Sequence, residues 1–403
     1  MRKKLYAMIT IVLLLSVMLS SCVNTGGLKI LKPDNSKPDE YYSSMNQGGQ
    51  IAFSYLNTPY GKYQNIGGFV YYSQYGNTEF KKLCTKEDCD HSTNECDSFV
   101  GNEIGYNTHI GYYNDKIYFT EFVSDMTLKL MSMDMFGKNH EVVKTIAADY
   151  DMASYISYGC FHNGYYYFLV TEGGSLGAVG NKDDNFYRIK LDSKSEYEKV
   201  FRDDAISEIS MFTIVGDKVF FYVNKTGINP TDYYNLKSDS IDFDLYMLSL
   251  EDNKFEHMTD KWAEYTNCYY DAEKGYCYKH NDGFYTLDLA TKQMNKVSDS
   301  VIEGGWRSVA NYYEDNIYVI TFTNTKDDRG YDLFSNSQTL YIFDKQYTLL
   351  DTYNGEFTGT TLGNMIDDTG DFIVISSNYK YPPDYYINKS DIGEGIILHK
   401  IGE

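Results

Sequence analysis

The sequence predicts an all-β fold, a single β-propeller of seven blades. A short aromatic strand recurs seven times after residue 50, at the spacing of about 40–50 residues that is typical of propeller blades. These strands are apolar on both faces, as in a sheet that packs between two neighbouring sheets. After the N-terminal apolar run, the helical period is never sustained for three turns, and all six prolines fall outside the predicted strands.

The clearest repeat runs from Tyr112 to Ile146. A polar turn at 114–115 precedes an aromatic strand at 116–120, and strands at 128–134 and 140–146 follow. The seven recurring strands are interpreted as the second strand of each blade: 68–72, 116–119, 165–169, 218–222, 275–278, 316–320 and 371–375. Six or eight blades are the alternatives in number, and an open β-solenoid or two β-sandwiches are the alternative folds.

Residues 1–21 predict an export signal. A basic start at 2–4 precedes an uncharged apolar run at 5–19, which is shorter than the about 20 residues of a membrane-spanning helix. The run ends in Leu19-Ser20-Ser21-Cys22, which resembles the bacterial lipobox. That resemblance implies that the preceding peptide is removed and that the Cys22 thiol carries a diacylglyceryl anchor. A plain secretory signal is the alternative.

Residues 22–50 are polar and rich in Gly, Ser and Pro, which predicts a flexible tether between the lipid and a propeller domain at 51–403. We therefore expect the protein on the outer face of the cell membrane, held there by its lipid anchor only. The last repeat shows no clear fourth strand. Ile51–Leu56 is expected to supply it and so to join the two ends of the ring.

The chain is strongly acidic, with a net charge of -21. Loss of the signal peptide would leave 33 basic and 57 acidic residues, a net charge near -24. This charge argues against nucleic acid as a partner and against a broad electrostatic hold on anionic lipid. The 42 tyrosines fit half-buried β-strands, and sugar stacking is considered only for those in loops. No cofactor is expected, and the protein is expected to be a monomer.

Four long connections between second and third strands are predicted on one face of the propeller: 171–185, 224–243, 323–338 and 378–394. Long loops in a compact repeat are more often functional than idle. The predicted ligand-binding side chains in them are Tyr233, Tyr234, Arg329, Tyr331, Tyr381, Tyr385 and Tyr386. The alternative is that these tyrosines only pack the loops against the blades.

Cys84, Cys89, His91 and Cys96 form the sharpest cluster in the sequence. Three thiols and an imidazole can make a tetrahedral zinc site. Their spacing is not that of a standard zinc finger, however, and an exported protein meets oxidising conditions. A disulfide between two of the three cysteines is therefore preferred to a metal site.

The remaining cysteines of the propeller domain give weaker signals. Cys268 and Cys277 flank a predicted turn, so they form either a cross-strand disulfide or two small buried hydrophobic side chains. Cys160 is expected to be buried and inert.

The segment Leu83–His91, followed by a third cysteine, resembles one that lies just after the first blade in many exported propeller lipoproteins of Firmicutes. With the lipobox and the blade pattern, this resemblance implies a propeller of the six-bladed TolB type or low-density-lipoprotein-receptor type. The function of such proteins is largely unassigned, so the resemblance implies a fold and no mechanism. The seven repeats counted here depart from the six blades of those relatives.

Catalytic patterns are weak. Residues 173–177 match G-x-S-x-G, but a nucleophile elbow needs a helix after the turn, and this segment lies between two predicted strands. Asp183–Asp184 and Asp327–Asp328 are interpreted as solvated acidic pairs and not as calcium ligands or an acid–base pair. An enzyme would place its reactive groups near the central axis, where the candidates are His109, Asp271 and Arg307.

The sequence therefore favours a surface-anchored binding or interaction module over an enzyme, with a glycan, a peptide or an envelope protein as its ligand. The second hypothesis is an enzyme on a propeller scaffold, such as a polysaccharide lyase or a glycosidase. The third is a structural or assembly component that binds no small ligand.

Overall fold

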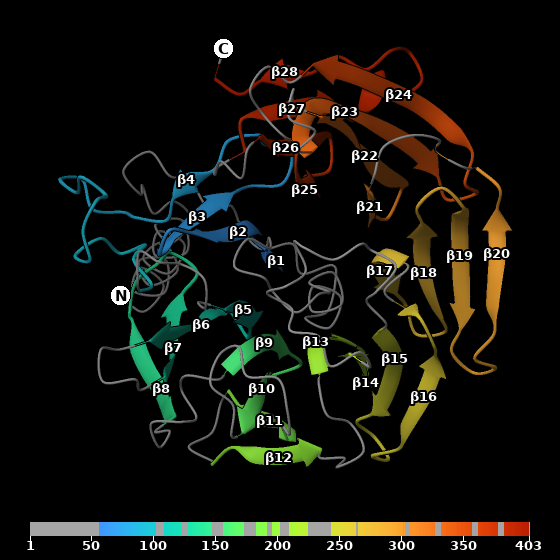
Figure 1. The fold of residues 1–403 in the computed structure, drawn as a ribbon. Helices are drawn as coiled ribbons and strands as arrows, with labels where there is room; N and C mark the ends of the chain where they lie inside the picture. Colours follow the sequence, from blue (N-terminus) through green and yellow to red (C-terminus); the bar gives the residue numbers. More distant parts are fainter. Residues whose placement is uncertain are drawn as a thin grey trace, which may run out of the picture.

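The computed structural model describes residues 56–101, 109–122, 128–146, 156–172, 183–191, 196–201, 209–224, 243–262, 265–300, 302, 307–326, 332–356, 362–377 and 383–402. These residues form seven antiparallel sheets of four strands each, arranged in a ring (Figure 1). The predicted all-β fold and the predicted seven blades are confirmed.

The first four blades are built from consecutive strands. Blade 1 contains β1 (Leu56–Thr58), β2 (Gly61–Ile66), β3 (Phe69–Ser73) and β4 (Lys81–Lys82). Blade 2 contains β5 (Ile110–Tyr113), β6 (Lys116–Phe122), β7 (Leu128–Asp134) and β8 (Glu141–Ile146). Blade 3 contains β9 (Ile156–His162), β10 (Tyr165–Glu172), β11 (Asp183–Lys190) and β12 (Glu198–Phe201). Blade 4 contains β13 (Ile209–Val215), β14 (Lys218–Asn224), β15 (Phe243–Ser249) and β16 (Phe255–Thr259).

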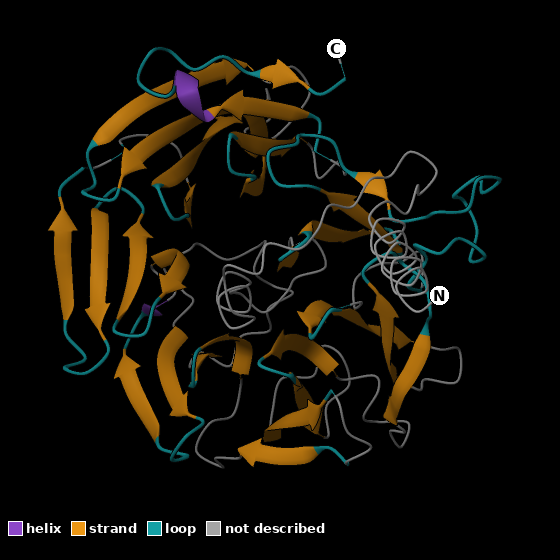
Figure 2. Cartoon of the chain, turned by 180° about the vertical axis from the view of Figure 1, so that it is seen from behind, coloured by secondary structure: helices purple, strands orange, loops and turns teal. Residues whose placement is uncertain are grey.

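The last three blades follow the same plan. Blade 5 contains β17 (Tyr265–Tyr270), β18 (Lys274–Lys279), β19 (Gly283–Asp288) and β20 (Met294–Ser298). Blade 6 contains β21 (Arg307–Tyr312), β22 (Asn316–Lys326), β23 (Asp332–Asp344) and β24 (Leu349–Glu356). Blade 7 contains β25 (Leu362–Asp368), β26 (Phe372–Ser377), β27 (Tyr385–Asn388) and β28 (His399–Lys400), with the short 3-10 helix η4 (Lys389–Asp391) after β27. Figure 2 shows the same ring of strands from behind.

Tight polar turns join the first and second strands in several blades. Asn114 and Asp115, with φ of 49° and 56°, connect β5 to β6, and Asn163 and Gly164, at 43° and 77°, connect β9 to β10. Left-handed conformation at both central residues matches the twist of the paired strands. Asn, Asp and Gly tolerate that conformation better than other residues. The sequence signal for these turns therefore has a direct backbone cause.

The buried side chains fall into seven clusters, and each cluster lies between two neighbouring blades. Between blades 3 and 4, the Phe186 ring packs edge-on against Phe212 and Phe221, with ring centroids 4.9 and 5.1 Å apart. Between blades 4 and 5, Phe220 stacks on Tyr270 at 4.0 Å. Each sheet is thus covered on both faces, which is why its central strands are apolar on both sides.

Three details of the prediction are wrong. Residues 68–72 contribute the third strand of blade 1, because β1 and β2 precede them and pair at Leu56↔Tyr63. Most of the expected loop at 323–338 instead belongs to paired strands, since β22 and β23 stay paired as far as Lys326↔Asp332, with a register shift between Phe322 and Asn324. The fourth strand of blade 7 is β28, so the described Leu56 does not fill that position.

The predicted signal peptide at 1–21, the lipid-anchor residue Cys22, the tether at 22–50 and residues 51–55 lie outside the described residues. Within the residues that the structure describes, no helix is both long enough and apolar enough to cross a membrane.

Candidate functional site

The cysteine cluster lies on a loop inserted into the outer strand of blade 1. Lys81 and Lys82 pair with β3, and the Leu83 backbone N–H donates to the Val70 carbonyl oxygen at 2.8 Å. The chain then leaves the sheet and returns at 98–100, where Phe99 bridges Phe69. Residues 84–97 are therefore an excursion whose two ends are fixed side by side on one strand. In Figure 1 this loop extends outward from the edge of blade 1.

The excursion, called the cysteine loop below, brings all four predicted residues together. The Sγ atoms of Cys84, Cys89 and Cys96 and one ring nitrogen of His91 all lie within 4.8 Å of one another. Cys84 and Cys96 are buried, and the three thiols are not joined in disulfides. His91 Nδ1 lies 3.5 Å from Cys96 Sγ. Four soft or borderline ligand atoms at this separation can surround a single metal ion.

Each thiol accepts a hydrogen bond from the residue two positions further along the chain. The His91 backbone N–H donates to Cys89 Sγ at 3.4 Å, and Cys96 Sγ lies 3.0 Å from the Ser98 hydroxyl. Burial alone would raise the pKa of the Cys84 thiol, but backbone N–H donors from Lys86 and Asp97 bring that pKa below its ordinary value. Burial raises the pKa of Cys96 to about 11, although Ser98 opposes this effect.

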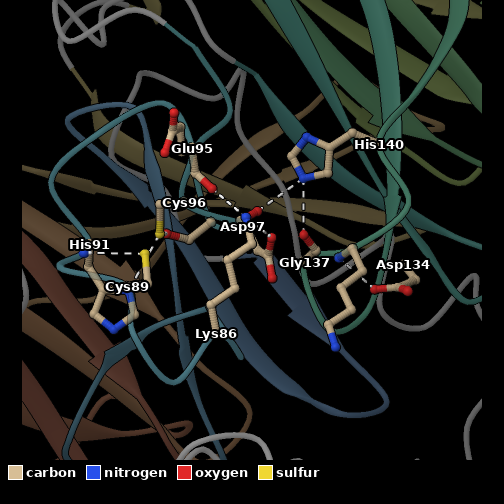
Figure 3. A network of polar contacts seen from close by, with 11 residues as sticks. Lys86, Cys89, His91, Glu95, Cys96, Asp97, Asp134, Gly137 and His140 are labelled. Atoms are coloured by element: carbon tan, nitrogen blue, oxygen red, sulfur yellow. Dashed lines mark hydrogen bonds and ion pairs between the residues drawn. The ribbon is translucent and has the colours of Figure 1, made fainter.

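The loop also contacts the turn between β7 and β8 of the second blade (Figure 3). His140 Nε2 lies 3.0 Å from the Asp97 carbonyl oxygen and 3.1 Å from that of Gly137. Both partners are acceptors, so Nε2 carries the proton. Gly137 has φ of 79°, and a Cβ there would lie 2.5 Å from the Leu83 oxygen. Lys86 Nζ pairs with Asp97 Oδ1 at 2.8 Å within the loop.

Of the seven predicted ligand-binding residues, the structure describes only Tyr385 and Tyr386. Tyr233, Tyr234, Arg329, Tyr331 and Tyr381 lie outside the described residues. Their grouping as a ligand-binding surface remains a prediction.

Tyr385 and Tyr386 were expected in a loop, and that placement is wrong because both belong to β27. Tyr386 stacks on His399 at 4.9 Å and meets Phe372 edge-on at 5.4 Å. Tyr385 packs against the cluster between blades 6 and 7. Both rings therefore pack at interfaces between blades, Tyr385 between blades 6 and 7 and Tyr386 between blades 7 and 1, and a packing role is the alternative considered for these tyrosines.

The candidate residues for an enzyme are not assembled into one site. His109 is buried and its Nδ1 lies 2.9 Å from the Tyr166 hydroxyl, while burial lowers its pKa to about 4. Asp271 belongs to the turn of blade 5, where its Oδ1 accepts from the backbone N–H of Lys274 and its Oδ2 from the Tyr276 hydroxyl. The side chain of Arg307 lies outside the described part of the chain.

The other weak motifs add no chemistry to the described residues. Residues 173–177 and the pair Asp327–Asp328 lie outside them, while Asp183–Asp184 begins β11 and their side chains are not described. These interpretations stay untested.

The other three cysteines within the described residues are free thiols that pack in the cores. Cys268 and Cys277 belong to the same cluster between blades 4 and 5, and Cys277 is fully buried. Cys160 packs between blades 3 and 4, as predicted, and burial raises the pKa of its thiol.

Sequence reasoning missed one further group, formed by Asp244, His257 and Asp260. His257 Nε2 lies 3.4 Å from Asp244 and 3.1 Å from Asp260. The signal for it is the pairing of β15 with β16, which no local motif reveals. With two of its three residues exposed, this group is explained as a surface ion pair.

No protein-family model matches the chain, and no curated protein matches it. Among solved structures, it is similar to an oligogalacturonate lyase in complex with manganese, at 10% identity over 71% of this chain and 73% of that one, with a TM-score of 0.45. It is also similar to TolB from Acinetobacter baumannii, at 10% identity over 72% of this chain and 60% of TolB, with a TM-score of 0.37.

A third similar structure is that of a nidogen/laminin complex, at 9% identity over 72% of this chain and 91% of that one, with a TM-score of 0.37. The propeller fold itself rests on the sheet topology of the described residues. At such identities they give this chain no ligand and no activity.

Proposed function

We propose that this protein is a lipid-anchored binding or interaction module on the outer face of the cell membrane. Its ligand is a glycan, a peptide or an envelope protein, held by the propeller face that carries the long connections between second and third strands. No nucleic acid and no membrane contact beyond the anchor are part of this function, because the chain is strongly acidic.

The observation that carries this proposal is the difference between the two faces of the ring. Strands alternate in direction within a blade, so connections from second to third strands share one face and those from first to second share the other. On the face with the connections from first to second strands, β13 joins β14 through Gly216–Asp217 alone. On the face with the connections from second to third strands, β10 joins β11 through 173–182, and β14 joins β15 through 225–242.

Long connections on a rigid scaffold are where proteins place variable binding residues. Short connections such as Gly67–Gly68 show that the blade itself does not require the extra length. The sequence of the longest connection contains Tyr233 and Tyr234, which combine flat apolar rings with a hydroxyl group. Such side chains suit both sugar stacking and peptide contacts.

A binding role is favoured over catalysis because the candidate reactive groups serve the fold. His109 is buried against Tyr166, and Asp271 caps its own turn. A general acid or base must lie within hydrogen-bond reach of a substrate. His109 is buried, and both carboxylate oxygens of Asp271 already accept hydrogen bonds from residues of its own hairpin.

The binding face is tested in the full-length chain, purified in detergent. Residues 226–240 are replaced by a short Asn-Gly turn, and both proteins are screened on a glycan array and a peptide library. A ligand bound by the parent chain is expected to be lost, while the melting temperature stays unchanged, because the strands of blade 4 supply the buried side chains of the cores on its two sides.

A matched control carries Asp217→Ala and Glu273→Ala, two exposed positions on the face with tight turns. This variant is expected to keep the ligand. Retained binding after loop replacement, or loss of binding in the control alone, would place the ligand elsewhere.

The anchor is tested separately. Cys22→Ala is expected to move the protein from the membrane fraction to the soluble extracytoplasmic fraction, because the lipid acceptor thiol is gone. Membrane association that persists in this variant contradicts a lipid anchor at Cys22.

A further inference from the structure

We infer that Cys84, Cys89, His91 and Cys96 hold one Zn²⁺ ion in a closed tetrahedral site that fastens the cysteine loop to blade 1. This role is independent of the proposed ligand-binding face, since the loop projects from the outer edge of the ring (Figure 1). It replaces the disulfide between two of the three cysteines that the sequence favours over a metal site.

The separations match the edges of a zinc tetrahedron. With Zn–S bonds of about 2.3 Å and Zn–N bonds of about 2.0–2.1 Å, tetrahedral angles put a nitrogen and a sulfur about 3.6 Å apart. The same geometry puts two sulfurs about 3.8 Å apart. The observed distance from His91 Nδ1 to Cys96 Sγ is 3.5 Å, and all four ligand atoms lie within 4.8 Å of one another. Small side-chain movements therefore complete the site.

The backbone holds His91 in an unusual conformation that serves this arrangement. His91 has φ of 56°, in the left-handed region, which is strained for a residue other than glycine. The preceding Asp90 stabilises the turn, since its Oδ1 accepts the Ser92 backbone N–H at 3.0 Å. The same turn directs the His91 N–H to Cys89 Sγ and its ring nitrogen to Cys96 Sγ.

The cysteine loop has no apolar core of its own. Its sequence from 84 to 97 contains no aliphatic or aromatic side chain apart from His91, and its fully buried side chains are those of Cys84 and Cys96. A segment of this kind needs a covalent or metal link to stay folded. A disulfide would use two of the four converging groups, whereas a metal ion uses all of them.

The donor set selects the ion. Thiolates and imidazole in a tetrahedron favour zinc over magnesium, calcium and manganese, which prefer oxygen ligands. Three thiolates with one Zn²⁺ leave a net charge of −1 at the centre. Lys82 Nζ donates to the His91 carbonyl oxygen and Lys86 Nζ to that of Glu95, so two ammonium groups lie beside the site.

Binding releases one proton from each thiol that becomes a thiolate, while His91 binds as the neutral imidazole. The His91 backbone N–H at Cys89 Sγ and the Ser98 hydroxyl beside Cys96 Sγ provide hydrogen-bond partners that orient two of the ligand sulfurs. With four protein ligands the site has no open position, so its role is structural and not catalytic.

The test uses the full-length chain, purified in detergent without chelator, reductant or added metal. Elemental analysis is expected to find one zinc per chain. Alkylation under denaturing conditions, with zinc removed, is expected to label Cys84, Cys89 and Cys96 fully. Trypsin cleavage after Lys82 and Lys86 separates the Cys84 peptide from the one with the other two cysteines.

Cys89→Ser and His91→Ala are expected to lose the zinc, while circular dichroism shows the propeller intact because the loop lies outside the strands. Ser98→Ala, which removes the hydroxyl beside Cys96, is expected to lower zinc affinity by about 10- to 100-fold in a chelator competition. His140→Gln is the matched control: it alters a histidine that contacts the loop without lying in the cluster, and it should keep one zinc per chain.

Replacement of zinc by Co²⁺ gives an independent readout, because tetrahedral cobalt with thiolate ligands has strong visible and charge-transfer absorption. A mapped disulfide among the three cysteines without bound zinc would overturn the inference. So would zinc that survives in both ligand variants, since the ion would then lie elsewhere. Iron or copper in place of zinc would overturn the assignment of the ion.

Discussion

His109 shows how a polar residue near the inner strands can be part of the fold. Its backbone N–H donates to Thr120 Oγ1 at 2.9 Å, and its ring lies against the Tyr166 hydroxyl. The neighbouring Gly159 leaves room for this contact, since a Cβ there would lie 2.3 Å from the Tyr166 oxygen and 2.8 Å from His109 Nδ1. The imidazole therefore has no space to be hydrated, and it stays neutral.

This burial predicts a pH dependence of stability. Because burial lowers the His109 pKa from 6.5 to about 4, the unfolded chain binds a proton below pH 6.5 that the folded chain does not. The contribution to stability is present above pH 6.5 and is lost as pH falls towards 4. Between pH 7.5 and pH 5 the loss is about 2 kcal/mol. Urea unfolding at the two pH values measures it.

The variant His109→Gln removes this titration and keeps a side chain that can hydrogen-bond to Tyr166. Its loss of stability between pH 7.5 and pH 5 is expected to be about 2 kcal/mol smaller than that of the parent chain. Leu349→Ala, at a side chain that is 49% exposed, should leave the pH dependence as it is. An identical pH dependence in the His109 variant would assign the effect to other groups.

At the scale of elements, the inner strands of blades 2 and 3 approach closely because one of them carries a glycine. A Cβ at Gly111 in β5 would lie 2.2 Å from both Cβ and Cγ of Phe161 in β9. The Phe161 ring in turn packs on Tyr166 with ring centroids 4.8 Å apart. The narrow inner end of the ring therefore has little room for a larger residue at this position.

Gly111→Ala is expected to destabilise the protein by about 1–3 kcal/mol, because the added methyl group forces the two strands apart. In a Phe161→Gly background the same change should cost much less, since both the Cβ atom and the ring that it meets are gone. Urea unfolding of the four proteins gives the coupling energy between the two positions. Additive effects would show that the strain at Gly111 has another source.

The sequence reveals long paired strands better than short ones. The second strands of six blades were located correctly, because aromatic runs such as Lys218–Tyr222 follow recognisable turns. In blade 1, β1 has three residues and β4 has two, and strands this short show no sequence pattern. The sequence therefore assigns β3 as a second strand, although it is the third. The strand ends at 323–326 and 332–337 were missed because they are polar.

The candidate site, too, could be predicted from the sequence only in part. The spacing of Cys84, Cys89, His91 and Cys96 identifies the members of the cluster, because all four lie on one short segment. It does not reveal that the segment interrupts an outer strand, since that depends on the pairing of Phe69 with Phe99. Nor does it show the contact with Gly137, which comes from the next blade.

At the scale of the whole molecule, the stability of the ring depends on its seven interfaces between blades. Among the described residues, the interface between blades 7 and 1 has the smallest core, with only Phe80 and Val374 buried and Tyr71 and Tyr386 packed against them. One backbone hydrogen bond, from Gly76 N–H to the Thr369 carbonyl oxygen at 2.8 Å, also crosses it. Since β28 completes its own blade, none of the described strands is shared across this interface.

We therefore expect the ring to open first between blades 7 and 1. Phe80→Ala should lower the free energy of unfolding by about 3 kcal/mol and speed amide exchange in β3 and β26. Exchange in β14, on the far side of the ring, should change little (Figure 1). Leu349→Ala, at a side chain that is 49% exposed, should alter stability by less than about 0.5 kcal/mol. Local opening at one interface leaves the amide protons of distant strands protected from exchange. A uniform rise in exchange over all seven blades would instead mean that the ring unfolds as one unit.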